Sequence, residues 1–300
     1  MKILLLGKDG QVGWELQRAL APLGELIALG RQDADLENVD RLLQAVRQAQ
    51  PQVIVNAAAY TAVDKAESEP AKARRINAEA VGSLAEEASR LNAWLVHYST
   101  DYVFDGEKST PYEEDDATGP LSVYGKTKLE GEQLIRQSNA SHLIFRTSWV
   151  YAARGANFAK TMLRLAKERE ELKVIADQHG APTSAELIAD VTALALYRIG
   201  QQTSASTLSG TYHLAAGGHT SWHGYAQHVL HLAQAKGATL KVAPAFVQPI
   251  PTDAYPLPAA RPRNSRLNTT KLSSAFNLHL PDWRYHVERL VDELAAQGAL

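Results

Sequence analysis

The first thirteen residues constrain the fold more than any other stretch. A short apolar run, Lys2 to Leu6, leads directly into glycines at positions 7, 10 and 13. An unbroken apolar run of this length is typical of a strand buried on both faces of a parallel sheet. Glycines let the backbone turn sharply and present N–H groups to a diphosphate at the positive end of the next helix. We therefore predict a strand, a tight turn and a helix, with Gly7, Gly10 and Gly13 at a dinucleotide; the alternative is an ordinary glycine-rich turn.

The same alternation of strand and helix continues through the first half of the chain. Small side chains follow the third strand, where Ala57 and Ala58 allow a ligand to approach the backbone closely. Regular alternation with long connections predicts an α/β fold, a Rossmann-like doubly wound parallel sheet, over residues 1–150. The predicted strands are 2–6, 25–29, 52–56, 94–98 and 142–146, and the predicted helices are 36–50, 70–91 and one that begins at 122.

Residues 151–300 have a different pattern and are predicted to form a smaller C-terminal α/β region that shapes the substrate pocket. Some of its segments are expected to return to the main sheet. We predict helices at 157–169, 185–199 and 283–296, strands at 172–175, 211–214 and 239–242, and loops at 201–209 and 244–262.

Composition excludes several classes of function. The chain has 300 residues, a formal net charge of −2 and no cysteine. Nucleic-acid and anionic-membrane binding therefore have no electrostatic basis, and thiolate chemistry is excluded. No apolar run approaches the roughly 18 residues that span a bilayer, and no cleavable leader precedes the first strand, so we predict a cytoplasmic protein.

The end of the second predicted strand bears on cofactor choice. Dinucleotide sites often place an acid here to hold a ribose 2′-hydroxyl, whereas an arginine accepts the 2′-phosphate of NADP. This chain has Gly30 and Arg31, with Asp33 and Asp35 just beyond. The residues favour NADPH, with NADH as the alternative; a solvated surface arginine would explain Arg31 without any cofactor.

Three residues have the chemistry of a hydride-transfer site. Tyr124 and Lys128 are four apart on a predicted helix, so they share one face. The ammonium favours the phenolate and so brings the phenol pKa toward neutrality. Thr100 follows the fourth predicted strand and is expected to orient a carbonyl oxygen that Tyr124 protonates as the hydride arrives. The alternative is that these side chains have only structural roles.

Several motifs together resemble those of the dTDP-4-dehydrorhamnose reductases, extended members of the short-chain dehydrogenase/reductase superfamily. The motifs are GKDGQVG, NAAAYTAVDKAE, STDYVFDG, YGKTKLEGE, FRTSWVY and RPRNSRL, and they span nearly the whole chain. The resemblance implies reduction of the C4 keto group of dTDP-4-dehydro-β-L-rhamnose to dTDP-L-rhamnose. Two other functions remain open: a nucleotide-sugar epimerase or dehydratase that retains NAD, and a non-catalytic NADP-binding regulatory subunit.

The resemblance also implies roles for individual residues. Thr100 is catalytic, Tyr124 is the proton donor and Lys128 its partner, and the last two also contact the cofactor. The other cofactor-binding positions are Gly10, Gln11, Val12, Asp35, Leu36, Ala59, Tyr60 and Thr61, and the substrate-contacting positions are Thr100, Asp101, Tyr102 and Trp149.

Ion binding and assembly are further expectations. By the same resemblance, Glu15, Glu186 and Glu293 match acids that hold Mg²⁺ in a homodimer; each also suits a surface helix position. From their chemistry, Arg261, Arg263 and Arg266 are candidates to bind the diphosphate of a nucleotide-sugar substrate, although ordinary surface arginines explain them as well.

Overall fold

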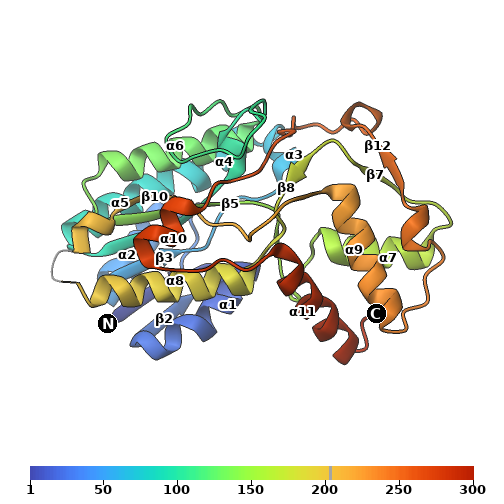
Figure 1. Cartoon of the computed structure of the whole chain (residues 1–300). Helices are drawn as coiled ribbons and strands as arrows, with labels where there is room; N and C mark the ends of the chain where they lie inside the picture. The colour runs from blue at the N-terminus through green and yellow to red at the C-terminus, as the bar shows by residue number, and fades with distance from the viewer. Residues whose placement is uncertain (203–204) are drawn as a thin grey trace.

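The structure is a computed structural model that describes residues 1–202 and 205–300. Its centre is a parallel sheet of six strands: β1 (Lys2–Leu6), β2 (Glu25–Leu29), β3 (Val53–Asn56), β4 (Trp94–Thr100), β5 (His142–Thr147) and β10 (Gly210–His213). They lie in the order β10-β5-β4-β3-β1-β2 (Figure 1). The predicted α/β class is confirmed, and each strand lies within two residues of a predicted segment.

Helices cover both faces of this sheet because its apolar side chains alternate between two cores. Ile3 and Leu5 belong to one core, and Leu4 and Leu6 belong to the other. Figure 1 shows α1 and α8 along one side and α4, α5 and α6 along the other. The helices of these layers are α1 (Gln11–Leu20), α2 (Val39–Ala49), α3 (Val63–Ala66), α4 (Pro70–Arg74), α5 (Ala80–Arg90), α6 (Val123–Gln137), α8 (Ala185–Gly200) and α10 (Thr270–Phe276).

The strand order reverses between β1 and β3, which is where open α/β sheets bind ligands. Gly7 follows β1 there with φ +82°, a conformation that favours glycine. A Cβ at Gly7 would lie 2.7 Å from the amide nitrogen of Ala58, beyond β3. The two strand ends therefore approach each other as closely as backbones allow, and larger residues would push them apart.

The helix predicted over residues 70–91 contains an interruption. Between α4 and α5 lies a π-helical turn, η2 (Arg75–Glu79), in which each turn holds an extra residue. Asn77 in this turn accepts a hydrogen bond from the amide of Tyr60 (2.9 Å) and donates to Tyr60 O (3.0 Å) and to Thr127 Oγ1 (3.2 Å). The turn thus joins the loop after β3 to helix α6.

The C-terminal region forms a second lobe, seen at the right of Figure 1. Its helices are α7 (Phe158–Glu168), α9 (Trp222–Ala235) and α11 (Trp283–Ala296). Its strands pair two by two: β6 (Val150–Tyr151) with β9 (Thr183–Ser184), β7 (Lys173–Ile175) with β12 (Gln248–Ile250), and β8 (His179–Gly180) with β11 (Thr220–Ser221).

Two predictions for this lobe are wrong. In addition, one helix of this lobe and one helix of the sheet layers were not predicted. Residues 239–242 form no strand; the amides of Lys241 and Val242 donate instead to Ala166 O at the end of α7. Strand β12 lies inside the stretch predicted as loop, where Pro249 is tolerated because β12 is an edge strand. Helices α9 and α10 were missed. Of the predicted loop at 201–209, residues 203–204 lie outside the described residues.

Short helical turns complete the described chain: η1 (Ala21–Leu23), η3 (Asp101–Val103), η4 (Ala205–Leu208), η5 (Pro244–Phe246) and η6 (Thr252–Ala254). Among the described residues, no helix combines the length and the apolar character needed to cross a membrane.

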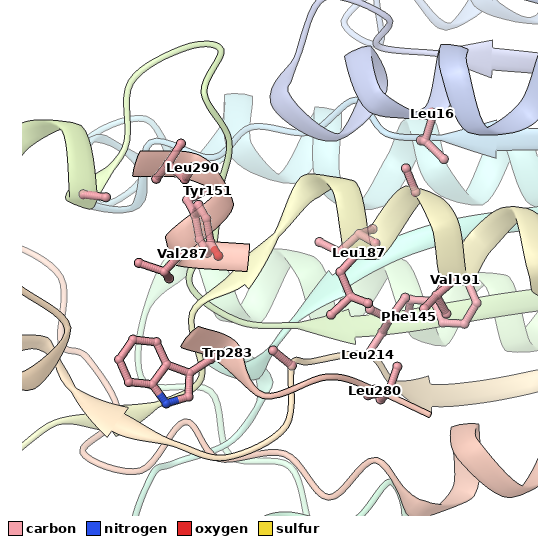
Figure 2. Packing of buried hydrophobic residues seen from close by; sticks show 14 of the residues in the cluster. Leu16, Phe145, Tyr151, Leu187, Val191, Leu214, Leu280, Trp283, Val287 and Leu290 are labelled. Atoms are coloured by element: carbon pink, nitrogen blue, oxygen red, sulfur yellow. The ribbon is translucent and has the colours of Figure 1, made fainter. Parts of the chain in front are cut away.

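One apolar core continues from the sheet into the second lobe. Figure 2 shows it extending from Leu16 of α1 past Leu187 of α8 and Phe145 of β5 to Trp283 and Leu290 of α11. Burial of this shared core fixes the position of the lobe over the carboxyl edge of the sheet.

Because α6 packs closely on η2, a side chain at Gly131 should destabilise the fold. A Cβ at Gly131 would overlap the carbonyl oxygen of Asn77, so Gly131→Ala should lower the free energy of unfolding by about 2–3 kcal/mol. The control is Gly200→Ala at the end of α8, where a Cβ meets nothing within 4 Å. It should be neutral or stabilise by up to about 1 kcal/mol. Urea denaturation measures both, and equal effects would contradict the packing argument.

Candidate active site

A cavity of about 640 Å³ lies at the carboxyl edge of the sheet, over the point where the strand order reverses. It is lined by residues at the ends of β4 and β5 and by the segments that follow β1, β2, β3, β4 and β5. The predicted residues that line it are Gly7, Gly10, Gln11, Val12, Arg31, Asp35, Leu36, Ala57, Ala58, Ala59, Thr61, Thr100, Asp101, Tyr102, Tyr124, Lys128 and Trp149.

Two predicted cofactor residues do not line this cavity. A Cβ at Gly13 would overlap the carbonyl oxygen of Gly7, so Gly13 allows α1 to pack against the end of β1. The side chain of Tyr60 donates to Glu69 Oε2 (2.8 Å). Both residues therefore support the segments that line the cavity without lining it themselves.

The N-terminus of α1 opens on the cavity. Gly10 is its N-cap residue, and no side chain caps the helix. A Cβ at Gly10 would be 3.5 Å from Gly7 O, an ordinary contact, so the protein itself leaves room there. Unpaired N–H groups and a positive dipole are the features that bind a diphosphate.

Arg31 lies at the far end of the cavity among acids. Its Nε donates to Asp35 Oδ2 (3.1 Å) and its Nη2 to Glu37 Oε2 (2.6 Å). Asp33 accepts from the amide of Gly30 (3.0 Å) and from Lys8 Nζ (3.3 Å). The region thus offers cations for a 2′-phosphate and carboxylates for a ribose hydroxyl, so this geometry accommodates either nucleotide.

Thr100, Tyr124 and Lys128 all face the cavity. Helix α6 starts beside the end of β4 because Gly125 has no Cβ to strike the carbonyl oxygen of Tyr102. Burial, followed by the nearby Asp101 carboxyl, raises the pKa of Tyr124, and a hydrogen bond with Thr100 acts in the opposite direction. The predicted shift of the Tyr124 pKa toward neutrality is therefore wrong for this structure, in which burial outweighs any effect of Lys128. The phenol is protonated, which is the form that gives a proton to a carbonyl oxygen.

Lys128 is almost wholly buried, with 1% of its surface exposed. Its Nζ donates to the carbonyl oxygen of Tyr98 (2.6 Å) and lies 3.0 Å from His97 Nε2. Burial lowers the pKa of Lys128 to about 8, while the charge of Glu132 acts in the opposite direction. Since Glu132 is paired with Arg146 (2.7 Å), it offsets little of this burial.

Asp101 is a buried carboxyl next to this cluster. Its Oδ1 accepts from Thr100 Oγ1 (2.9 Å), whereas its Oδ2 has no hydrogen-bond partner among the described residues. Burial raises the pKa of Asp101 to about 6, and the nearby Ser265 and Thr100 side chains act in the opposite direction. An unpartnered buried oxygen at the cavity wall suits a substrate hydroxyl.

Trp149 forms the side of the cavity next to the second lobe. It has φ +48°, an uncommon conformation for a bulky residue. Its indole stacks on Trp222 of α9, with ring centroids 3.6 Å apart, and a Cβ at Gly180 would lie 2.6 Å from the ring. The second lobe therefore fixes this aromatic wall, and Trp222 was not predicted.

The three predicted phosphate-binding arginines are held apart. Arg261 pairs with Asp64 (2.7 Å), Arg263 lies 3.8 Å from Asp253, and Arg266 donates to Asn264 and to Ser109 O. They do not converge on one point of the cavity, and each is engaged within the chain.

The predicted metal ligands lie outside the cavity, on α1, α8 and α11. Burial raises the pKa of Glu15, and the charges of Glu186 and Glu293 raise it further. Glu15 pairs with Arg18 (3.6 Å) and Glu186 with Arg289 (3.2 Å). In the part of the chain that the structure describes, no three carboxylates or histidines come together as a metal site.

The reversal of strand order, the glycine turn and a buried lysine beside a tyrosine define a class, the nicotinamide-nucleotide-dependent short-chain dehydrogenases/reductases. A family model described as the RmlD substrate binding domain matches residues 1–296. The dTDP-4-dehydrorhamnose reductase of Shigella flexneri is 55% identical over 100% of both chains. The chain belongs to the dTDP-4-dehydrorhamnose reductase family.

Solved structures agree with this assignment. A dTDP-4-dehydrorhamnose reductase from Clostridium acetobutylicum matches with a TM-score of 0.89 and 37% identity, covering 98% of this chain and 99% of that one. The Bacillus anthracis reductase, solved in complex with NADP, matches with a TM-score of 0.86 and 34% identity, covering 98% of this chain and all of that one.

The buried carboxyl of Asp101 should make the free energy of unfolding depend on pH. Because its pKa rises from 3.8 to about 6 on folding, the carboxyl stabilises the fold at low pH. That contribution is lost as pH rises through about 6. Relative to Asp101→Asn, the free energy of unfolding of the unmodified protein should fall by about 2–3 kcal/mol between roughly pH 3.5 and 7. Urea denaturation across this range measures it; a constant difference between the two proteins would contradict the assignment.

Proposed function

We propose that this chain reduces the C4 keto group of dTDP-4-dehydro-β-L-rhamnose to dTDP-L-rhamnose with NADPH. The observation that carries the proposal is that Thr100, Tyr124 and Lys128 line one cavity together with the glycine turn after β1. Membership of the reductase family and the NADP complex of the Bacillus anthracis relative support it.

NADPH supplies the hydride when it is bound. The turn at Gly7 and Gly10 and the open N-terminus of α1 hold its diphosphate, and Ala57 and Ala58 let the nucleotide lie against the strand ends. Arg31 exchanges its carboxylate partners for the 2′-phosphate. The carboxylates around Arg31 leave NADH as a second cofactor.

The protein's own side chains orient the carbonyl group and supply the proton that its oxygen takes up. When substrate binds, Thr100 turns its hydroxyl from Asp101 and donates a hydrogen bond that orients the carbonyl oxygen. Tyr124 transfers its phenolic proton to that oxygen as the carbon is reduced. Lys128 stabilises the phenolate that results. Asp101 accepts a hydrogen bond from a substrate hydroxyl, and Trp149 packs on the sugar ring.

Three further expectations concern the surroundings of the enzyme. A cytoplasmic location and a homodimer remain predictions. For Mg²⁺, the charges of Glu186 and Glu293 act on Glu15, but Glu15 and Glu186 are paired with arginines. We therefore assign the ion no role in the reaction, and its binding would require ligands from a second copy of the chain.

Consumption of cofactor distinguishes a reductase from an epimerase or dehydratase that returns its hydride to the sugar. Mixing the protein with NADPH and the 4-keto sugar nucleotide should reduce the absorbance at about 340 nm in proportion to the alcohol formed. A changed sugar without net loss of NADPH would instead show retained NAD, and an unchanged sugar would favour a regulatory subunit.

Tyr124→Phe removes the proposed proton donor and keeps the ring. Turnover should fall by about 100-fold or more, because general acid catalysis contributes at least that much. NADPH binding, followed by protein fluorescence, should stay within about threefold. Tyr197→Phe is the matched control, since Tyr197 is exposed on α8 and lies outside the cavity. Retained turnover in Tyr124→Phe would refute this role.

A further inference from the structure

A chain of hydrogen bonds lies behind Lys128. The amide N–H of Ala58 donates to Asn56 Oδ1 (3.1 Å), and Asn56 Nδ2 lies 3.2 Å from His97 Nδ1. His97 Nε2 lies 3.0 Å from Lys128 Nζ. Asn56 and His97 are paired across β3 and β4, each has 1% of its surface exposed, and neither lines the cavity. The proposed mechanism uses neither residue.

The direction of each bond follows from the first donor. A backbone N–H only donates, so the group that faces it must be the oxygen of the Asn56 amide. The nitrogen of that amide, which also only donates, then faces His97 Nδ1. Nδ1 must accept, and a neutral imidazole that accepts at Nδ1 carries its proton on Nε2. Burial and the Lys128 charge hold the pKa of His97 well below its ordinary value, so the ring is neutral.

The proton on Nε2 points at Lys128 Nζ. An ammonium group has three N–H bonds and no lone pair, so it would oppose this donor. A neutral amine accepts the Nε2–H bond and still donates to Tyr98 O (2.6 Å). The other titratable groups on this side are Tyr124 and Glu132 of α6, and Glu132 is paired with Arg146. The hydrogen bonds therefore favour the deprotonated form of Lys128.

We propose that Asn56 and His97 are positioning residues whose hydrogen bonds stabilise the neutral amine of Lys128 over its ammonium form. This inference rests on the proposed roles of Tyr124 and Lys128. In each reduction, the phenol O–H of Tyr124 breaks and its proton bonds to the carbonyl oxygen. The ammonium form of Lys128 stabilises the phenolate that remains, whereas the amine form, whose lone pair accepts the His97 N–H, carries no charge to do so.

The tautomer of His97 is measurable without turnover. Long-range ¹H–¹⁵N spectra of the full chain without substrate, about one unit above the Lys128 pKa of about 8, should show His97 neutral with its proton on Nε2. His213 is an internal control with the opposite tautomer, since its Nδ1 faces the carbonyl oxygens of Tyr112 and Asn268 (3.1 Å each). A proton on Nδ1 of His97, or a doubly protonated ring, would overturn the proposal.

The variant Asn56→Asp should reverse the chain of hydrogen bonds while keeping its shape. The carboxylate still accepts from Ala58 and now also accepts from His97 Nδ1, so the imidazole proton moves to Nδ1 and Nε2 accepts from the ammonium. The pKa of Lys128 then rises. The alkaline limb of the kcat–pH profile should move up by about one unit, with KM within about twofold.

An alkaline limb that stays in place in Asn56→Asp would overturn the proposal. If this variant does not fold, the tautomer of His97 in the unmodified chain still tests the proposal. The proposed function of the site and the proposed role of Asn56 and His97 are tested by different measurements. If Tyr124→Phe retained turnover, the proposed function of the site would be wrong whatever the tautomer. If only the tautomer differed, the reductase would stand and the role of Asn56 and His97 would be wrong.

Discussion

Much of this structure follows from placing one amino group, that of Lys128, in a nearly solvent-free position beneath the end of β4. Burying an amino group is costly unless its polar atoms are satisfied, and here a carbonyl oxygen accepts from it while the imidazole of His97 lies within hydrogen-bond distance. To bring these groups together, α6 must approach both β4 and the π-helical turn closely. Gly125 and Gly131 make that approach possible because neither carries a Cβ. The geometry of the reacting groups is thus set by close backbone contacts of neighbouring glycines on α6.

Periodicity and residue type predicted the sheet well because its central strands, such as β1 and β3, are buried on both faces and their apolar runs are unambiguous. The failures occurred where tertiary contacts outweigh local preference. The π-helical turn is stabilised by Asn77 reaching the backbone of Tyr60, and no local pattern reports that contact. Strand β12 includes Pro249, which argued for a loop until the edge position of the strand was known.

In the candidate site, too, local motifs predicted some residues, whereas others are brought in only by tertiary contacts. Thr100, Tyr124, Lys128 and the glycines stand in recognisable motifs, so each was predicted individually. The partners of these residues come from elsewhere in the chain: Asn56 and His97 meet only through strand register, and Trp222 reaches Trp149 only after the second lobe has folded. Lone polar residues inside apolar strands were the one available signal for Asn56 and His97. The salt bridge from Arg261 to Asp64 joins residues 197 positions apart and has no sequence signature.

The chain passes between the two lobes several times. After β6 and α7 it returns to the sheet layer with α8 and β10, leaves again for α9 and β12, and comes back once more with α10 before α11. Neither lobe is therefore a continuous segment, and the shared core in Figure 2 joins them. A cut near residue 150 would leave β5 as an unpaired edge and strip α1 of its covering helix. Modular exchange of the sugar-recognising half among related enzymes would accordingly require several simultaneous crossovers, whereas single side chains around Trp149 can be replaced one at a time.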